Sequence, residues 1–220
     1  MGAIANKAAE NKALAQKAAK PVSMQDYVNK YHAQISAALP KVGITPERFT
    51  RLVLSALSTT PDLAQCEPKS FLGAMMTCAQ MGMEPNTPLG QAYLIPYNNR
   101  RKGIKECQYK LGYKGLIELA HRSGQVQTIF AEAVCENDEF TYELGVDAKL
   151  IHKPRLDGPR GNVTCYYAVW KGTDGGYGFA VMSRDDIIRH RNMFSKAQNS
   201  PWDTNFDEMA KKTVLKKALK

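Results

Sequence analysis

The pattern of apolar residues changes at Gln91, and no other feature constrains the fold as strongly. Before this point apolar side chains recur at helical spacing, for example in the segment that Thr45 can cap and Pro46 can open. After it, short runs rich in aromatic and β-branched residues alternate with polar turns, which is typical of strands. Helical spacing returns after Ser183. This order predicts the α+β class, with N-terminal helices, a central mostly antiparallel sheet with a basic hairpin, and C-terminal helices packed on or beside the sheet.

The expected helices carry recognisable end signals. Ser70 is predicted to cap one helix, and Ser183 with Asp186 resembles a capping box. Thr204 with Asp207 repeats that pattern before the terminal helix. Apart from the helix that Pro46 opens, we expect helices over residues 24–39, 71–81 closed by Gly82, 114–123 closed by Gly124, from 183 to about 197, and 209–220.

Strands are expected in the middle of the chain. Two of them flank a polar, basic turn at residues 98–103, which makes a hairpin. Two others are joined through residues 174–176, an Asp-Gly-Gly turn. The predicted strands span residues 91–97, 104–111, 126–136, 140–144, 163–171 and 177–182.

Composition sets the number of domains. The chain has 220 residues, 44% of them hydrophobic, and domains of roughly 100 to 200 residues are the usual unit. Residues 1–22 carry almost no large apolar side chain, so burial cannot offset their ordering entropy, and we predict a flexible basic tail. Residues 23–220 are predicted to form a single α+β domain. Because the chain stops at Lys220 within a helical pattern, we expect this domain to be truncated at its C-terminus.

Positive charge is the main functional signal. Thirty Lys and Arg residues against 21 Asp and Glu leave a net charge of +9, which attracts polyanions such as nucleic acid, an anionic membrane surface or an acidic protein. The bases gather around the hairpin, from 99 to 115, and in the last helix, from 209 to 220, whereas residues 132–147 hold six acids and no base. A groove lined by the two basic regions, with the acidic stretch turned away, would bind a polyanion.

Two features favour single-stranded nucleic acid among the polyanions. Lys212, Lys216 and Lys220 recur every four residues, so their like charges repel on one helix face unless an anion relieves them; a merely solvated face is the alternative. Aromatic residues lie among the bases, and stacking of a base on such a ring tolerates any sequence. Half-buried strand positions are the alternative for the tyrosines. The aromatic residues are Tyr93, Tyr97, Tyr109, Tyr113 and Trp202.

Enzyme, metal and membrane signals are absent from the sequence. It contains no P-loop, no G-x-S-x-G and no H-E-x-x-H motif. The five cysteines are odd in number, widely spaced and typical of reduced thiols, and no apolar stretch reaches the length of a membrane span. Acidic pairs such as Asp185 with Asp186 leave a Mg²⁺-dependent nuclease as one alternative function, although helix capping explains that pair as well. A basic scaffold on a membrane surface is the other alternative.

Five ordered sequence runs together resemble the RecT family of phage recombinases. The resemblance extends from about Leu39 to the end of the chain. The runs are Gly82-Met-Glu-Pro-Asn-Thr-Pro-Leu-Gly-Gln-Ala-Tyr-Leu-Ile-Pro-Tyr97, Leu111-Gly-Tyr-Lys-Gly-Leu-Ile-Glu-Leu-Ala120 with Arg122-Ser-Gly124, Leu150-Ile-His-Lys-Pro154, His190-Arg-Asn192 with Ser195-Lys-Ala197, and Met209-Ala-Lys-Lys-Thr-Val-Leu215.

The resemblance implies a protein that binds single-stranded DNA and anneals complementary strands without ATP in phage homologous recombination, acting as an oligomeric ring or filament. It implies no hydrolytic site and no cofactor, with Mg²⁺ as a candidate modulator of annealing. It also implies a bacterial cytoplasmic location, a phage or prophage origin and a partner 5′→3′ exonuclease. The family usually continues with a further C-terminal segment that contacts the host single-strand-binding protein. This sequence lacks that segment.

Matching the motifs residue by residue gives the predicted DNA contacts. Within the last run, Lys211 and Lys212 are favoured over Lys216, Lys217 and Lys220, which lie beyond it. Trp202 is added because it precedes the terminal helix. The predicted DNA-binding residues are Lys110, Tyr113, Lys114, Arg122, Lys153, Arg191, Ser195, Lys196, Trp202, Lys211 and Lys212.

Overall fold

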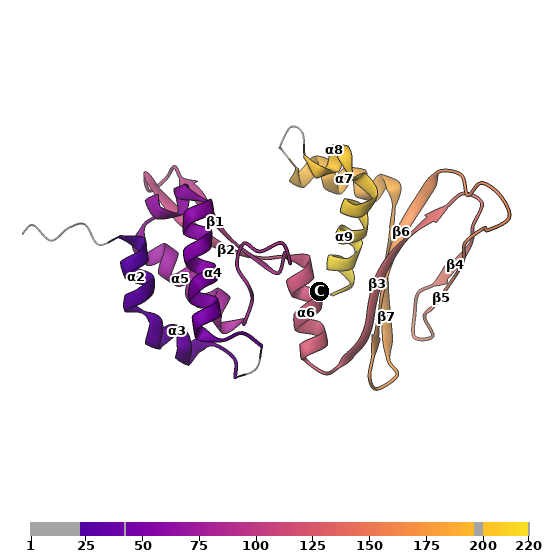
Figure 1. Cartoon of the computed structure of the whole chain (residues 1–220). Coiled ribbons are helices and arrows are strands. Elements are labelled where there is room, and N and C mark those ends of the chain that lie inside the picture. The colour runs from indigo at the N-terminus through magenta and orange to yellow at the C-terminus, as the bar shows by residue number, and fades with distance from the viewer. Residues whose placement is uncertain (1–22, 42, 196–199, 220) are drawn as a thin grey trace, which may run out of the picture. The chain divides into compact units, whose positions relative to one another are not determined.

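The computed structural model describes residues 23–41, 43–195 and 200–219. These divide into two compact units, and the boundary along the chain falls between Lys110 and Leu111. Helices, then strands, then helices follow one another along the chain, so the predicted α+β class is confirmed (Figure 1). Both units fall within the stretch predicted to be one domain, and the single domain stays a prediction. The predicted tail, residues 1–22, lies outside the described residues.

The first unit consists of helices and one hairpin. Its side chains with no exposure include Val28, Ile35, Phe49, Val53 and Leu63, which belong to successive helices and form the apolar interior. The hairpin lies where the sequence predicts it. The elements are α2 (Met24–Lys30), α3 (His32–Ala38), α4 (Pro46–Thr59), η1 (Pro61–Gln65), α5 (Pro68–Gln80), β1 (Ala92–Asn99) and β2 (Ile104–Leu111).

Helix ends in this unit partly follow the predictions. Thr45 caps α4 by accepting a hydrogen bond from the backbone N–H of Arg48 at 3.3 Å, and Gly82 has the left-handed φ of 60° that suits a residue after a helix. The helix predicted over 24–39 is interrupted at Tyr31.

The predicted cap at Ser70 is wrong. Helix α5 begins at Pro68, three residues before its predicted start at residue 71. Proline suits the first helical position, and Glu67 precedes it as the N-cap. The Ser70 hydroxyl donates to the Glu67 carbonyl at 2.7 Å and accepts from the backbone N–H of Cys107 at 2.9 Å. Ser70 therefore ties α5 to the hairpin.

The second unit is built on a three-stranded antiparallel sheet in the order β3-β6-β7. One face of this sheet packs against α9 (Figure 1), and Tyr166, Ala168 and Val214 are fully buried between them. The elements are α6 (Tyr113–Arg122), β3 (Val126–Cys135), β4 (Glu139–Glu143), β5 (Lys149–Lys153), β6 (Val163–Gly172), β7 (Tyr177–Ser183), α7 (Arg184–Phe194), α8 (Pro201–Thr204) and α9 (Phe206–Ala218).

A second hairpin, β4–β5, packs against the opposite face of this sheet. The ring of Phe140 stacks on Tyr167 with centroids 5.6 Å apart, and His152 contacts both the Tyr167 hydroxyl and the Asp138 carboxylate at 3.1 Å. Arg160 donates two hydrogen bonds to Asp138, at 2.9 and 2.6 Å, and holds the pKa of that carboxyl well below its usual range. Strand β5 was not among the predicted strands, since residues 149–153, Lys-Leu-Ile-His-Lys, include one β-branched residue and no Phe, Tyr or Trp.

The C-terminal helices include one confirmed and one wrong cap. Ser183 and Asp186 form the predicted capping box at the start of α7. Thr204 lies in α8, and the N-cap of α9 is Asn205, so the capping box predicted for Thr204 with Asp207 is wrong. The Asp207 carboxylate instead accepts a hydrogen bond from the buried Tyr166 hydroxyl, which fixes the start of α9 on the sheet.

Candidate nucleic-acid interface

The predicted DNA contacts are divided between the two units. Lys110 lies in the hairpin of the first unit, with the other hairpin bases, whereas the contacts from Tyr113 to Lys212 lie in the second. Lys196 lies outside the described residues. A groove that joins the hairpin to the terminal helix would need residues of both units, so it stays a prediction.

Helix α9 turns Lys212 and Lys216 away from the sheet, because it buries Ala210, Val214 and Leu215 on its other side. Lys217, three positions after Val214, lies close to the sheet, where it lines a hollow with Phe179 and Val181 of β7. Lys212 is half-buried, and its ammonium lies 5.9 Å from the centre of the Tyr113 ring. Burial lowers the pKa of Lys212, and repulsion from Lys216 lowers it further.

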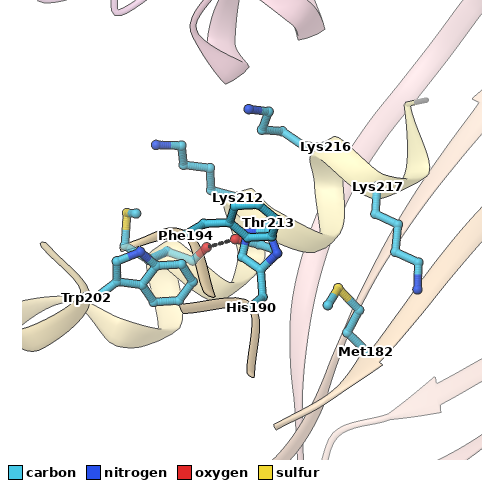
Figure 2. A pocket seen from close by; sticks show the side chains of 9 residues that line it. Met182, His190, Phe194, Trp202, Lys212, Thr213, Lys216 and Lys217 are labelled. Carbon is cyan, nitrogen blue, oxygen red and sulfur yellow. Dashed lines mark hydrogen bonds between the residues drawn. The ribbon is translucent and has the colours of Figure 1, made fainter. Parts of the chain in front are cut away.

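A pocket of about 540 Å³ opens beside these lysines (Figure 2). Three of the helices and one strand supply its walls. Thr213 turns its hydroxyl to its own helix, where it donates to the Met209 carbonyl at 2.8 Å. The lining residues are Met182 of β7, His190 and Phe194 of α7, Trp202 of α8, and Met209, Lys212, Thr213, Lys216 and Lys217 of α9.

Charge pairing separates the pocket lysines, together with Lys110 and Lys114, from the other described bases that were predicted to contact DNA. Lys153 pairs with Glu139 at 2.7 Å, Arg122 with Glu118 and Lys211 with Glu208 at 3.4 Å, and Arg191 with Asp203. Among the residues that the structure describes, no carboxylate pairs with the pocket lysines, Lys212, Lys216 and Lys217, nor with Lys110 or Lys114. Three unpaired ammonium groups around one pocket can hold an anion.

The structure places the predicted aromatic residues in different environments. Trp202 is only 7% exposed, and its ring centre lies 5.7 Å from that of Phe206, which favours a structural role. The stacking of Trp202 on DNA stays a prediction. The Tyr109 hydroxyl is buried, which raises its pKa to about 12. Tyr93 and Tyr97 are exposed on β1.

Sequence reasoning missed part of the pocket. Phe194, 70% exposed at the end of α7, was not considered, although it lies between the two parts of the fourth quoted family run. Lys216 and Lys217 were ranked below Lys211, which does not line the pocket. Helical spacing alone could have separated Lys216 from Lys211, because Lys212 and Lys216 lie on one helix face and Lys211 lies on another. Ser195 follows Phe194 as the C-cap of α7.

The acidic stretch acquires counter-charges in the fold. Glu139 and Glu143 stand opposite Lys153 and Lys149 across the β4–β5 hairpin. Asp138 is held by Arg160, and Asp186 by the capping box and by Arg189. Of the pair considered for a nuclease, Asp186 is thus engaged in structural contacts, whereas Asp185 is exposed.

The described part of the chain holds neither a cluster of metal ligands nor a membrane-spanning helix. Within it, no three His, Cys, Asp or Glu side chains gather as ion ligands, and no helix combines the length and apolar character needed to cross a membrane. All five cysteines are unbridged, and burial raises the pKa of Cys78 and Cys107 to about 12.

Comparison with known proteins decides the family. The model of the RecT family matches residues 47–220, most of the chain. The chain belongs to the RecT family. It is 42% identical to Protein RecT of Escherichia coli K12 over 191 residues, which cover 85% of this chain and 70% of that protein. It is also 28% identical to the uncharacterized protein YqaK of Bacillus subtilis 168 over 183 residues, 81% of this chain and 60% of YqaK.

Membership in the RecT family implies single-strand annealing in recombination, with binding of single-stranded DNA and self-association. The expected resemblance is therefore confirmed at the level of the family. Which residues touch DNA is not decided by membership, and the contacts named above remain proposals.

Proposed function

We propose that this chain binds single-stranded DNA and anneals it to a complementary strand without ATP, as an oligomeric ring or filament, in phage homologous recombination. The observation that carries the proposal is the set of unpaired lysines on α9, around a pocket that also holds an exposed ring, in a chain of the RecT family. Such a surface suits a strand that offers both phosphates and unstacked bases.

The energetics of annealing require no nucleotide hydrolysis. Two phosphate backbones repel each other, and lysine contacts to one of them lower that repulsion. Each base-pair step then contributes on the order of 1.4 kcal/mol, so pairing itself drives the reaction and supplies the sequence discrimination. The protein has to hold the strand accessible and extended. Neither a hydrolytic site nor a cofactor is needed for this role, and Mg²⁺ would act only as a modulator.

The biological setting forms part of the same proposal. A 5′→3′ exonuclease of the phage would supply the single strand, since an annealing protein needs one to coat. The host single-strand-binding protein is a second proposed partner, through the C-terminal segment with which the family usually continues. Both would meet the protein in the cytoplasm of the bacterial host.

The test mixes the full chain with two complementary labelled oligonucleotides in the absence of ATP. Annealing should be faster than for the DNA alone, and the complexes should contain several copies of the chain. Strand length is measured in the same samples with and without Mg²⁺. Unaccelerated annealing would contradict the proposal, and shortened strands would establish the nuclease alternative.

A further inference from the structure

The pocket beside α9 has walls of two kinds. Lys212, Lys216 and Lys217 supply cationic groups, whereas Met182, Phe194, Trp202 and Met209 form an apolar side. Figure 2 shows Lys216 extending away from the ring cluster of His190, Phe194 and Trp202, and Lys217 extending in another direction, beside Met182. Phosphate alone would need only the cationic groups, because a phosphate gains nothing from contact with aromatic and thioether groups.

Phe194 is the most exposed part of the apolar side. It is 70% exposed at the end of α7, and its ring centre lies 4.7 Å from that of His190 at a tilt of 46°. His190 supports one side of the ring, and the pocket leaves the rest of it accessible. A large exposed ring that borders a cationic pocket is suited to stacking with a flat, anionic ligand.

We propose that this pocket holds one nucleobase of the bound strand, stacked on Phe194 and separated from its neighbours, while Lys212, Lys216 and Lys217 contact the flanking phosphates. The inference rests on the proposed function, because it assumes that the ligand is single-stranded DNA. It adds that the strand is held partly by a base, and not by its backbone alone.

The pocket should accept any base. Its lysine ammonium groups end flexible chains and therefore impose little geometry. The Thr213 hydroxyl, which could otherwise donate to a base edge, already donates to the Met209 carbonyl at 2.8 Å. A ring used for stacking holds purines and pyrimidines alike, as an annealing protein requires.

A base in the pocket cannot pair at the same time. It must leave the pocket when the complementary strand arrives, so pairing removes the contact between this base and Phe194. Removal of the Phe194 ring should therefore weaken binding of single-stranded DNA more than binding of the annealed product.

The test compares two DNA ligands and two neighbouring substitutions. One ligand is an oligothymidylate, and the other is an oligomer of equal length and charge in which every base is missing. Phe194→Ala removes the ring, and Met193→Ala is a matched control because Met193 is 68% exposed in the same helical turn but does not line the pocket. Binding is measured per protomer at fixed salt, and circular dichroism checks the fold of each variant.

Phe194→Ala should weaken binding of the oligothymidylate by about fivefold or more, since stacking on a ring contributes about 1–3 kcal/mol per base. Binding of the base-free oligomer should be unchanged. Phe194→Tyr, which keeps a ring, should restore affinity, and Met193→Ala should affect neither ligand. The double variant Lys216→Gln with Lys217→Gln should weaken binding of both ligands, because both carry phosphates.

Equal losses for the two ligands, or no loss for either, would overturn the base-holding pocket. Neither result would touch the proposed function, which is judged by annealing with the unaltered chain. Conversely, a chain that binds oligothymidylate through Phe194 but does not accelerate annealing would keep the pocket and refute the annealing role.

Discussion

At the scale of single residues, Lys212 combines a proposed DNA contact with a destabilising effect on the fold. Its folded-state pKa lies below the ordinary 10.5 because burial and Lys216 both disfavour its charged form. Between the folded and the ordinary pKa, the unfolded chain binds more protons than the folded one, so stability rises with pH in that window. Below the folded-state pKa, Lys212 is charged in both states, and the full free-energy cost of holding the charged form in the folded protein is present. A nearby phosphate would relieve that cost, which makes Lys212 suited to binding an anion.

Replacement of Lys212 should separate stability from binding. Lys212→Met removes a like-charge pair that costs roughly 0.2–0.5 kcal/mol, and it loses a cation–π contact with Tyr113 of about 0.5 kcal/mol. The free energy of unfolding should therefore change by less than about 0.5 kcal/mol, whereas binding of single-stranded DNA should weaken by on the order of 1 kcal/mol. Urea unfolding and DNA titration measure the two effects.

Lys211→Met is the matched control for this substitution. Lys211 is also a predicted DNA contact, but it pairs with Glu208 and does not line the pocket, so its loss should weaken DNA binding less than the loss of Lys212. If both variants lost affinity equally, the pocket would not distinguish the two lysines. The sequence alone favoured them together, because a family run names positions but not the faces on which they lie.

At the scale of elements, the two expected capping boxes provide a direct comparison. The Ser183 hydroxyl accepts from the Asp186 backbone N–H at 3.0 Å, whereas Thr204 only accepts from the side chain of its neighbour Asn205. Ser183→Ala should lower the free energy of unfolding by about 1 kcal/mol, the usual effect of losing an N-cap. Thr204→Ala should change it by less than about 0.5 kcal/mol, as for other exposed positions. Chemical denaturation of the two variants gives both values, and similar losses would contradict the assignment of the caps.

Elements with local signals were predictable, and those fixed by distant contacts were not. The first hairpin, the β6–β7 turn and the Ser183 cap depend on residues a few positions apart. Strand β5, by contrast, has few residues that favour strands and forms through pairing with β4. Asn86 is similar: it adopts a φ of 54°, and its side chain bonds both the N–H and the carbonyl of Leu94, at 2.7 and 3.2 Å. The run from Gly82 to Tyr97 was recognised as a family motif, but this clamp on β1 needs the fold.

At the scale of the whole molecule, charge is organised differently from the linear sequence. The acidic stretch that seemed to oppose the basic regions meets Lys149, Lys153 and Arg160 within its own unit. Many bases are likewise neutralised by local carboxylates. The net charge of +9 therefore does not show which basic groups are available to DNA. What matters for binding is the subset without a carboxylate partner, and linear charge counts cannot identify it.

The salt dependence of binding should report this subset. For single strands, log affinity falls with log salt at a slope of about −0.7 per phosphate contact, so about four contacts per protomer give a slope near −3. The triple variant Lys212→Met, Lys216→Gln, Lys217→Gln should reduce the steepness by about 2, because it removes three contacts. Lys171→Gln, an exposed lysine on β6 outside the pocket, is the control with an unchanged slope. A triple variant that kept the full slope would place the phosphate contacts elsewhere, since lost contacts must release fewer counterions whatever the DNA sequence.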